Sequence, residues 1–307
     1  MRKMKSLFLL SIVSILLVAG CTNVDLGLNN GNSLSSGQGL EMTSFTVEPS
    51  TVYSGTKVRL NMEVQNMGGT SVNYTNDLVY LTGTNFDKWQ GTAYNSFGTT
   101  EMKTQDVVRD VPANVKKFSW SLTAPAVNAG QLETDTFIAR VYTEYQTNAN
   151  ANVWVYSEGE ADAARTAGRS LYTPTFTYTN GPVGLSVSVS PNPAVIYSGD
   201  NSFTMNIKIS NQAQGTIYYP GSVNYANSVT IDSTKLNMVK LSTVASDTGV
   251  TVGTECNGDQ ELIEGKDTTV VCTITVPATT FKSYGFSITA KYGYFTEKTA
   301  TVTVQGK

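Results

Sequence analysis

Hydrophobic and polar residues alternate along much of the chain, in short runs separated by glycine, proline, serine and asparagine. In "KVRLNMEVQN" (57–66) and in "SFTMNIKISN" (202–211), every second residue is apolar. A period of two places neighbouring side chains on opposite faces, as in a β-strand that turns one face toward a core. The chain is therefore expected to be all-β, and short strands between turn signals favour a β-sandwich.

This pattern occurs twice. A Tyr-Ser-Gly turn precedes each of these strands, at 53–55 and at 197–199, and each strand ends in asparagine. The closing segments match as well, because 137–155 and 286–304 each resemble an alternating pair of strands joined by a polar turn. We interpret the chain as a duplication of one sandwich domain.

The duplicated pattern resembles archaeal and bacterial immunoglobulin-like surface modules, including the CARDB (cell-adhesion-related) and S-layer-associated types. The resemblance covers 42–156 and 183–307, and its motifs are short and structural. It therefore implies two tandem immunoglobulin-like β-sandwiches and indicates fold more than function.

The expected organisation combines these domains with an N-terminal region and a linker. The alanines and charges of "SEGEADAARTAGRS" in the linker are expected to form one short helix, and relative motion of the two domains is the default expectation. The parts are a signal peptide (1–20), a lipidated flexible tether (21–40), domain 1 (41–156), the linker (157–182) and domain 2 (183–307).

The N-terminal residues have the pattern of a secretory signal. Basic residues at 2, 3 and 5 precede a largely apolar run from Leu7 to Ala19, which is too short to span the hydrocarbon core of a membrane. Val18-Ala19-Gly20-Cys21 resembles the lipobox of prokaryotic lipoproteins. The resemblance implies that Cys21 carries a diacylglyceryl group and becomes the mature N-terminus. An ordinary secretory signal with a chance cysteine is the alternative.

A lipid on Cys21 would anchor the protein to a membrane without spanning it, because two acyl chains suffice for stable attachment. The Asn-, Ser- and Gly-rich segment that follows lacks a core-forming pattern and is expected to act as the tether. The predicted location is extracytoplasmic, at the cell surface or in the periplasm.

Composition narrows the function classes. Of 307 residues, 40% are hydrophobic and 15% are charged, and the net charge is -3. The 21 basic residues form no cationic stripe, so nucleic acid is not expected as a partner. Histidine is absent, which removes the most frequent general base and metal ligand. We therefore predict no catalysis, no cofactor and no metal.

Two cysteines remain once Cys21 is assigned to lipid: Cys256 and Cys272, both in the second repeat. An even number outside the cytoplasm suggests a structural disulfide between them. In the first repeat, Trp120 occupies the place of Cys272. Two reduced, buried thiols are the alternative, because spacing alone does not establish bridge geometry.

Two short motifs suggest chemistry but fit turns better. Ser54 and Lys57 have the spacing of a lysine-activated serine nucleophile, yet the second repeat keeps the serine, at Ser198, without the lysine. The segment from Glu255 to Glu261 alternates oxygen-bearing side chains that could suit calcium, but it departs from the EF-hand spacing. Both motifs are interpreted as turns.

The repeats diverge between residues 70 and 105, where the first repeat holds aromatic residues among Gly, Asn and Thr. Aromatic side chains on a polar loop can stack on sugar rings or bury into a protein partner, so this loop is the candidate contact surface. The alternative is that the rings cap the end of the sandwich. The four residues are Phe86, Trp89, Tyr94 and Phe97.

The sequence therefore predicts a membrane-anchored surface lipoprotein with a structural or adhesive role, in contact with a protein or a glycan. Two alternatives stay open. One is a carbohydrate- or ligand-binding lipoprotein that uses the loop around Trp89. The other is an assembly subunit of a filament or surface layer, because sandwiches expose strand edges that can pair between protomers.

Overall fold

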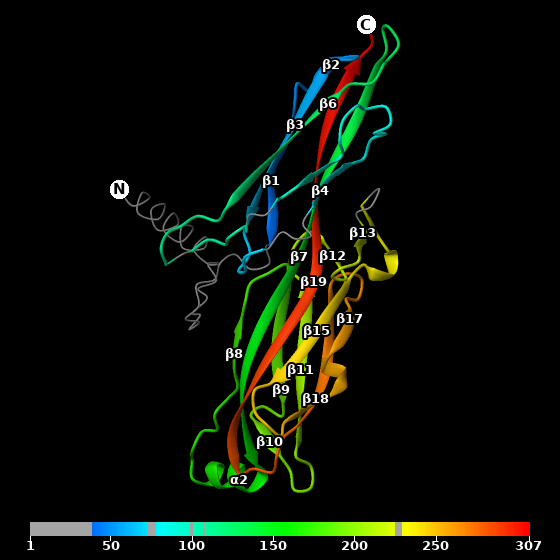
Figure 1. Cartoon of the computed structure of the whole chain (residues 1–307). Coiled ribbons are helices and arrows are strands. Elements are labelled where there is room, and N and C mark those ends of the chain that lie inside the picture. The colour runs from blue at the N-terminus through cyan, green and yellow to red at the C-terminus, as the bar shows by residue number, and fades with distance from the viewer. Residues whose placement is uncertain (1–38, 73–77, 99–100, 107, 225–228) are drawn as a thin grey trace, which may run out of the picture. The chain divides into compact units, whose positions relative to one another are not determined.

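The computed structural model describes residues 39–72, 78–98, 101–106, 108–224 and 229–307, and strands dominate this part of the chain (Figure 1). The expected signal peptide and Cys21 lie outside the described residues. The strands of the first repeat are β1 (Leu40–Glu48), β2 (Thr51–Tyr53), β3 (Lys57–Asn66), β4 (Leu78–Thr82), β5 (Tyr94–Ser96), β6 (Val115–Thr123) and β7 (Leu132–Ser157).

The rest of the chain forms the connecting segment and the second repeat. The connecting segment contains α2 (Glu158–Thr166) and β8 (Thr175–Tyr178). The second repeat contains two short 3-10 helices, η1 (Ser233–Lys235) and η2 (Thr254–Cys256). Its strands are β9 (Val183–Ser190), β10 (Ala194–Ile196), β11 (Ser202–Asn211), β12 (Thr216–Tyr218), β13 (Val223–Asn224), β14 (Thr230–Ile231), β15 (Met238–Ala245), β16 (Thr251–Val252), β17 (Gly258–Glu261), β18 (Asp267–Thr275) and β19 (Phe281–Gln305).

The two strands with the clearest alternating pattern, β3 and β11, are central strands of two sheets. β3 lies between β1 and β6, and β11 lies between β9 and β18, with β16 beyond β18. Their apolar faces are buried because every second side chain points into a core. The buried residues are Val58, Leu60, Met62 and Val64 on β3, and Phe203, Met205, Ile207 and Ile209 on β11.

A third sheet contains strands of both repeats, in the order β17-β15-β19-β7-β4-β5. Its central strands, β7 and β19, are the closing strands of the repeats, and they run antiparallel side by side (Figure 1). All 25 residues of β19 pair with β7, from Phe281 opposite Tyr156 to Gln305 opposite Leu132. The ladder therefore runs through both halves of the fold.

Each half of this shared sheet faces the sheet of one repeat. In one half, the ring of Phe97 meets Phe118 of β6 edge to face, with centroids 4.8 Å apart. In the other half, Phe203 of β11 meets Phe286 of β19 at 6.3 Å. Most buried apolar residues of both halves belong to one continuous hydrophobic core. The prediction of an all-β fold with facing sheets is confirmed.

Short strands next to the ladder are arranged reciprocally. β2 of the first repeat pairs in parallel with the end of β19, where Val52 lies opposite Val304. β10 of the second repeat pairs in parallel with the end of β7, where Val195 lies opposite Tyr156. Each sandwich therefore contains half of the long strand that belongs to the other repeat.

The closing segments differ from the expectation of two strands joined by a turn. Residues 137–155 and 286–304 each lie within one uninterrupted strand. The polar residues of the expected turn in β7 alternate with buried ones such as Thr147 and Ala149, so they keep the strand period and form the outward face. No reversal is needed, because the backbone pairs with β19 throughout.

Relative motion of the two halves is a second expectation that the structure corrects. β7 continues without a break from one half into the other, and a hinge there would break ladder hydrogen bonds with β19. The ranges 41–156 and 183–307 describe the repeats in the sequence. The sandwiches share strands across that division.

The alanine-rich part of the linker forms α2, directly after β7. The hydroxyl oxygen of Ser157 caps the helix by accepting from the N–H of Glu160 at 3.3 Å. Ala161 is buried in a small apolar cluster with Tyr156 and Val195, on the opposite face of β7 from the main core. Across the described residues, no helix has the length and apolar character needed to cross a membrane.

Candidate functional site

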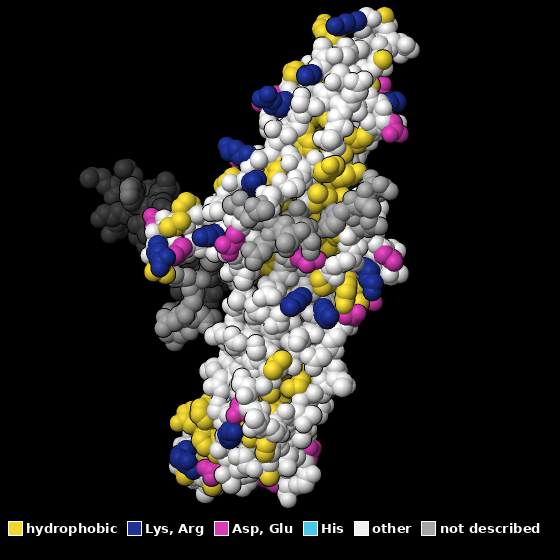
Figure 2. All heavy atoms as spheres, in the orientation of Figure 1, with side chains coloured by type: hydrophobic (Ala, Val, Ile, Leu, Met, Phe, Trp, Pro, Cys, Tyr) yellow, Lys and Arg dark blue, Asp and Glu magenta, His cyan; other side chains and the backbone are white. Residues whose placement is uncertain are grey.

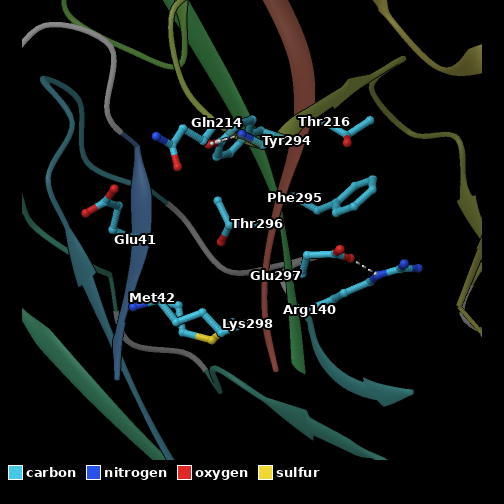
Figure 3. A pocket seen from close by; sticks show the side chains of 11 residues that line it. Glu41, Met42, Arg140, Gln214, Thr216, Tyr294, Phe295, Thr296, Glu297 and Lys298 are labelled. Atoms are coloured by element: carbon cyan, nitrogen blue, oxygen red, sulfur yellow. Dashed lines mark hydrogen bonds and ion pairs between the residues drawn. The ribbon is translucent and has the colours of Figure 1, made fainter. Parts of the chain in front are cut away.

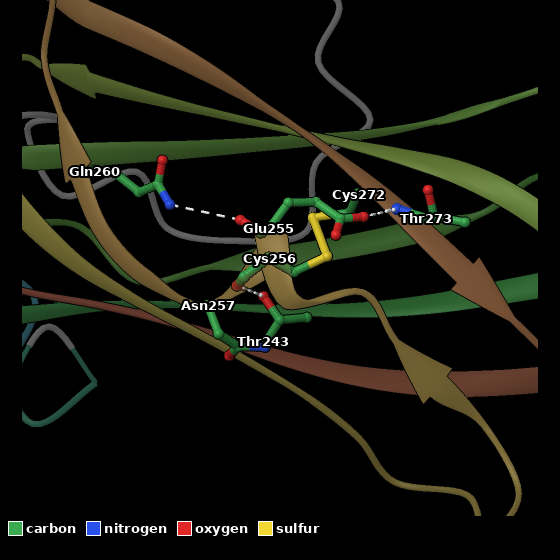
Figure 4. The surroundings of a disulfide bond; sticks show 7 residues. All are labelled: Thr243, Glu255, Cys256, Asn257, Gln260, Cys272 and Thr273. Carbon is green, nitrogen blue, oxygen red and sulfur yellow. Dashed lines mark hydrogen bonds between the residues drawn. A yellow bond between two sulfur atoms is a disulfide. The ribbon is translucent and has the colours of Figure 1, made fainter.

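The predicted disulfide between Cys256 and Cys272 is present (Figure 4). Cys256 lies in η2 and Cys272 in β18, both side chains are buried, and the Cα atoms are 5.3 Å apart. Thr243 of β15 donates a hydrogen bond to the carbonyl oxygen of Cys256 at 3.0 Å. The bridge therefore ties the turn between β16 and β17 to β18, which gives it a structural role.

Cys272 and Trp120 occupy equivalent positions in the two repeats. Trp120 lies opposite Leu60 in the β3–β6 ladder, and Cys272 lies opposite Met205 in the β11–β18 ladder. Both side chains are buried. The first repeat thus places an indole ring at the core position where the second repeat has its covalent bridge.

The segment from Glu255 to Glu261 uses its oxygens within the fold. A carboxylate oxygen of Glu255 accepts from the backbone N–H of Thr273 at 2.6 Å, and this hydrogen bond lowers the pKa of Glu255. Gln260 donates to the carbonyl oxygen of Glu255 at 3.5 Å. In the part of the chain that the structure describes, no three His, Cys, Asp or Glu side chains are grouped so that they could hold a metal ion.

Ser54 lies in a turn whose contacts are structural. Its hydroxyl oxygen accepts from the N–H of Val127 at 2.9 Å, and its own N–H donates to the carbonyl oxygen of Gln305 at 2.9 Å. Gly55 follows with a φ of 74°, a left-handed conformation that favours glycine. These contacts hold the turn before β3 against the end of β19.

The aromatic residues of the predicted contact loop are mostly turned inward. Trp89 is 2% exposed and packs edge to face on Phe137 with centroids 5.0 Å apart, while Phe97 is 1% exposed. Phe86 packs partly buried against the same core. Tyr94 is the exposed member of the four, at 62%.

The prediction of an exposed aromatic contact loop is therefore corrected for Trp89 and Phe97. The indole N–H of Trp89 donates to one carboxylate oxygen of Asp135 at 3.1 Å, and the hydroxyl of Thr84 donates to the other at 2.6 Å. With its polar edge satisfied in this way, the indole ring can close the end of the sandwich core.

A polar groove lies where β1 passes β19 (Figure 3). Arg140 and Glu297 form an ion pair across the shared sheet, with Nε and Oε2 2.8 Å apart, and the guanidinium of Arg140 lies 5.3 Å from the ring centroid of Phe295. The groove has a volume of about 360 Å³ and is lined by Glu41, Met42, Arg140, Gln214, Gly215, Thr216, Tyr294, Phe295, Thr296, Glu297 and Lys298.

The charged groups of this groove hold its walls together. Burial has the largest single effect on the pKa of Arg140 and lowers it, but the hydrogen bonds and charges of Glu297 and Tyr142 together outweigh burial, so the pKa is raised. Lys298 donates to the carbonyl oxygen of Thr43 on β1 at 3.2 Å. Burial raises the pKa of Tyr294 to about 12. We interpret the groove as a junction between β1 and the shared sheet.

A second group of aromatic residues lies beside α2, at the end of β7. Trp154 of β7 stacks on Phe281 of β19 with centroids 5.1 Å apart and an angle of 13° between the rings. Tyr172, in the segment after α2, lies 6.1 Å from Phe281 at 22°. Tyr172 is 60% exposed and Phe281 39%, and Figure 2 shows hydrophobic side chains at the surface in this region. We call Trp154, Tyr172 and Phe281 the aromatic platform.

Sequence reasoning missed this platform because its members lie on three separate segments. One signal was available for Trp154. Val153 and Val155 fill the core, so the alternation of β7 turns Trp154 outward. Nothing in the local pattern brings Tyr172 or Phe281 to it.

Comparisons with known proteins show little about the function. No protein-family model matches the chain, and no curated protein matches it. One similar solved structure is that of Escherichia coli alpha-2-macroglobulin activated by porcine elastase, at 10% sequence identity and a TM-score of 0.21. The similarity covers 83% of this chain and 32% of that one, and at this level it carries no argument.

Proposed function

We propose that this protein is a lipid-anchored, extracytoplasmic surface protein with a structural or adhesive role. The segment that ends at Cys21 supports the anchor, since it combines a secretory pattern with a lipobox-like sequence. The disulfide supports an extracytoplasmic location, because such bonds persist in oxidising compartments.

The observation that carries the structural role is the β7–β19 ladder. Each sandwich contains half of the other repeat's long strand, so the two halves cannot separate without breaking many backbone hydrogen bonds. Surfaces at the two ends of the ladder therefore keep a constant separation. A protein that positions contact surfaces outside a membrane benefits from this rigidity.

The described chain enters the fold near the middle of the ladder, at Gly39. The carbonyl oxygen of Gly39 accepts from the N–H of Met67 at 2.8 Å, and the ring of Pro182 lies where a side chain on residue 39 would begin, with Tyr145 close by. Tyr145 pairs with Tyr292 close to the ladder's midpoint. Roughly a dozen residues of each strand extend either way, which is about 40 Å at about 3.4 Å per residue. An anchor on Cys21 would therefore be joined to the middle of this unit.

Metabolic labelling with a fatty acid tests the anchor. Cells that express the full chain are grown with labelled palmitate, and the protein is followed through detergent phase separation. We expect wild type to carry the label and enter the detergent phase, and Cys21→Ser to do neither.

The matched control is the double variant Cys256→Ala/Cys272→Ala, which changes the other two cysteines and should keep the label. Wild-type protein that is unlabelled with a free thiol at Cys21 would contradict the proposal. So would a Cys21→Ser protein that still enters the detergent phase.

A further inference from the structure

We propose that the aromatic platform binds the sugar rings of a neutral polysaccharide. This inference rests on the adhesive role proposed above and names the chemistry of the partner. It replaces the loop around Trp89, whose ring is buried, with Trp154, Tyr172 and Phe281 as the glycan-contacting residues.

The three rings of the platform form a stacked cluster. Phe281 stacks on Trp154 and on Tyr172, at 13° and 22°, and the most exposed ring of the three is Tyr172, at 60%. The faces of aromatic rings are electron-rich and attract the apolar C–H groups on the faces of sugar rings. The exposed part of Tyr172 can therefore stack on a sugar unit, with the other two rings supporting it.

The fold holds the rings of the platform in place before any ligand arrives. Trp154 and Phe281 stand on the paired strands β7 and β19. Beside them on the same face of the sheet, the ring of the buried Tyr156 lies 4.8 Å from that of Phe281, and its hydroxyl oxygen accepts from the backbone N–H of Tyr172 at 2.7 Å. Little conformational entropy is therefore lost when a ligand stacks on the platform.

Uncharged polar groups lie beside the platform. Asn152 precedes Trp154 by two residues and Ser283 follows Phe281 by two, so both lie on the same face of the shared sheet as the platform. The side chains of Asn152 and Ser283 are hydrogen-bonded to each other. Uncharged amide and hydroxyl groups next to aromatic rings are suited to binding sugar hydroxyls.

Most charges beside the platform are paired. Arg165 of the adjacent helix pairs with Asp162 at 3.0 Å, and Arg169 after the helix pairs with Glu160 at 3.4 Å. These pairs exert little net attraction on a charged ligand, and the remaining acidic residue of the helix, Glu158, would repel an acidic one. This arrangement favours a neutral polysaccharide over an acidic polymer.

The test measures retention of the full chain, purified in detergent, on insoluble cellulose and on insoluble chitin. The variant is Tyr172→Ala, and the matched control is Tyr94→Ala, which removes a tyrosine of similar exposure on the other half of the fold. We expect wild type and Tyr94→Ala to be retained equally on at least one polysaccharide. Tyr172→Ala should bind about tenfold more weakly.

Tryptophan fluorescence gives an independent measurement. Trp89 and Trp120 are buried, whereas Trp154 is half-buried in the platform. Titration with a soluble cello- or chito-oligosaccharide should change the emission of wild type. Trp154→Phe should lose this change and still be retained on the polysaccharide, because an aromatic ring remains.

Three results would overturn the proposal. These are equal retention of Tyr172→Ala and wild type, failure of both polysaccharides to retain wild type, and capture of a protein through the platform without polysaccharide binding. Thermal unfolding shows whether each variant is folded. If Tyr172→Ala is poorly folded, Phe281→Ala serves as a second variant, and it should also lose retention on the polysaccharide.

The same experiment separates this inference from the anchoring proposal. Purified Cys21→Ser protein should bind the polysaccharide as wild type does. We therefore expect Cys21→Ser to lose fatty-acid labelling and to keep polysaccharide binding. Wild type that is lipidated but never retained on either polysaccharide refutes the platform and leaves the anchor in place.

Discussion

Asn66 and Tyr145 bind the same residue of the loop that follows β3. The side-chain amide of Asn66 donates to the carbonyl oxygen of Thr70 at 3.0 Å, and the hydroxyl oxygen of Tyr145 accepts from the N–H of Thr70 at 3.2 Å. Asn66 also donates to the carbonyl oxygen of Met102 at 2.8 Å and accepts from the N–H of Gly68 at 3.0 Å.

The second repeat contains the same arrangement. Asn211 donates to the carbonyl oxygen of Gly215 at 3.1 Å, and the N–H of Gly215 donates to the hydroxyl of Tyr294 at 3.0 Å. The asparagine that ends the core strand in both repeats therefore joins that strand to the following loop. The tyrosines join the loops to the shared ladder.

Asn66→Ala should destabilise the fold by about 2–3 kcal/mol, because buried backbone groups around Asn66 lose their hydrogen-bonding partner. Chemical denaturation measures the free energy of unfolding. Asn128→Ala, at an exposed position, serves as the control and should change that energy by less than about 0.5 kcal/mol. Equal effects of the two substitutions would show that the loop contacts do not matter for stability.

The two halves should unfold in one transition, because the ladder belongs to both. Met205 is buried in the second half, and Met205→Ala should cost about 2–5 kcal/mol. In a Trp154→Phe background, the remaining fluorescence comes from Trp89 and Trp120 in the first half. When Met205→Ala is added to this background, the unfolding midpoint reported by that fluorescence should fall by as much as the midpoint measured by calorimetry. A first-half signal unaffected by Met205→Ala would mean that the halves unfold independently.

The disulfide should stabilise the second half. Its cysteines are separated by 16 positions, for which the chain-entropy model gives about 3 kcal/mol. Cys256→Ala/Cys272→Ala should therefore lower the denaturation midpoint, and reductant should lower that of wild type but not that of the variant. No effect of reductant on wild type would argue against a stabilising bridge.

Stability at high pH should depend on Tyr294. Burial raises the pKa of Tyr294 in the folded protein to about 12, against about 10 in an unfolded chain. A raised pKa contributes stability that is complete below about pH 10 and is lost as pH rises from about 10 to 12. Tyr294→Phe cannot ionise, so its unfolding free energy should fall less steeply over this range. Identical pH profiles for the variant and wild type would contradict this assignment.

Trp89→Ala should act as a core substitution. The ring is buried against Phe137, so truncation should cost about 3–5 kcal/mol of stability. Polysaccharide retention of the protein that remains folded should not change. Loss of retention with unchanged thermal stability would restore the loop as a contact surface.

Much of the fold could be predicted because burial is visible in local sequence. Alternating residues in β3 and β11 identify core strands, and their repetition identifies the duplication. The bridge between Cys256 and Cys272 followed from cysteine counting. The uninterrupted β7 was not predicted, because the polar residues of its outer face also fit a turn.

The sequence predicted an aromatic contact surface in the loop around Trp89, whereas the structure exposes an aromatic cluster at the aromatic platform. A polar loop with aromatic residues is compatible with an exposed surface and with a cap on the core. Asp135, which lies 46 residues from Trp89, satisfies the indole N–H and allows burial. Such a partner cannot be identified from the loop alone.

The sequence alone determined which side chains face a core. Alternate residues of a strand lie on the same face, so apolar residues at every second position identify the buried face. The pairing of β7 with β19 needed the tertiary structure, since ladder hydrogen bonds come from backbone groups that nearly every residue carries. That pairing interlocks the two repeats and places Trp154 next to Phe281. Local pattern therefore defines the strands, whereas long-range backbone pairing defines the scaffold and the surface it presents.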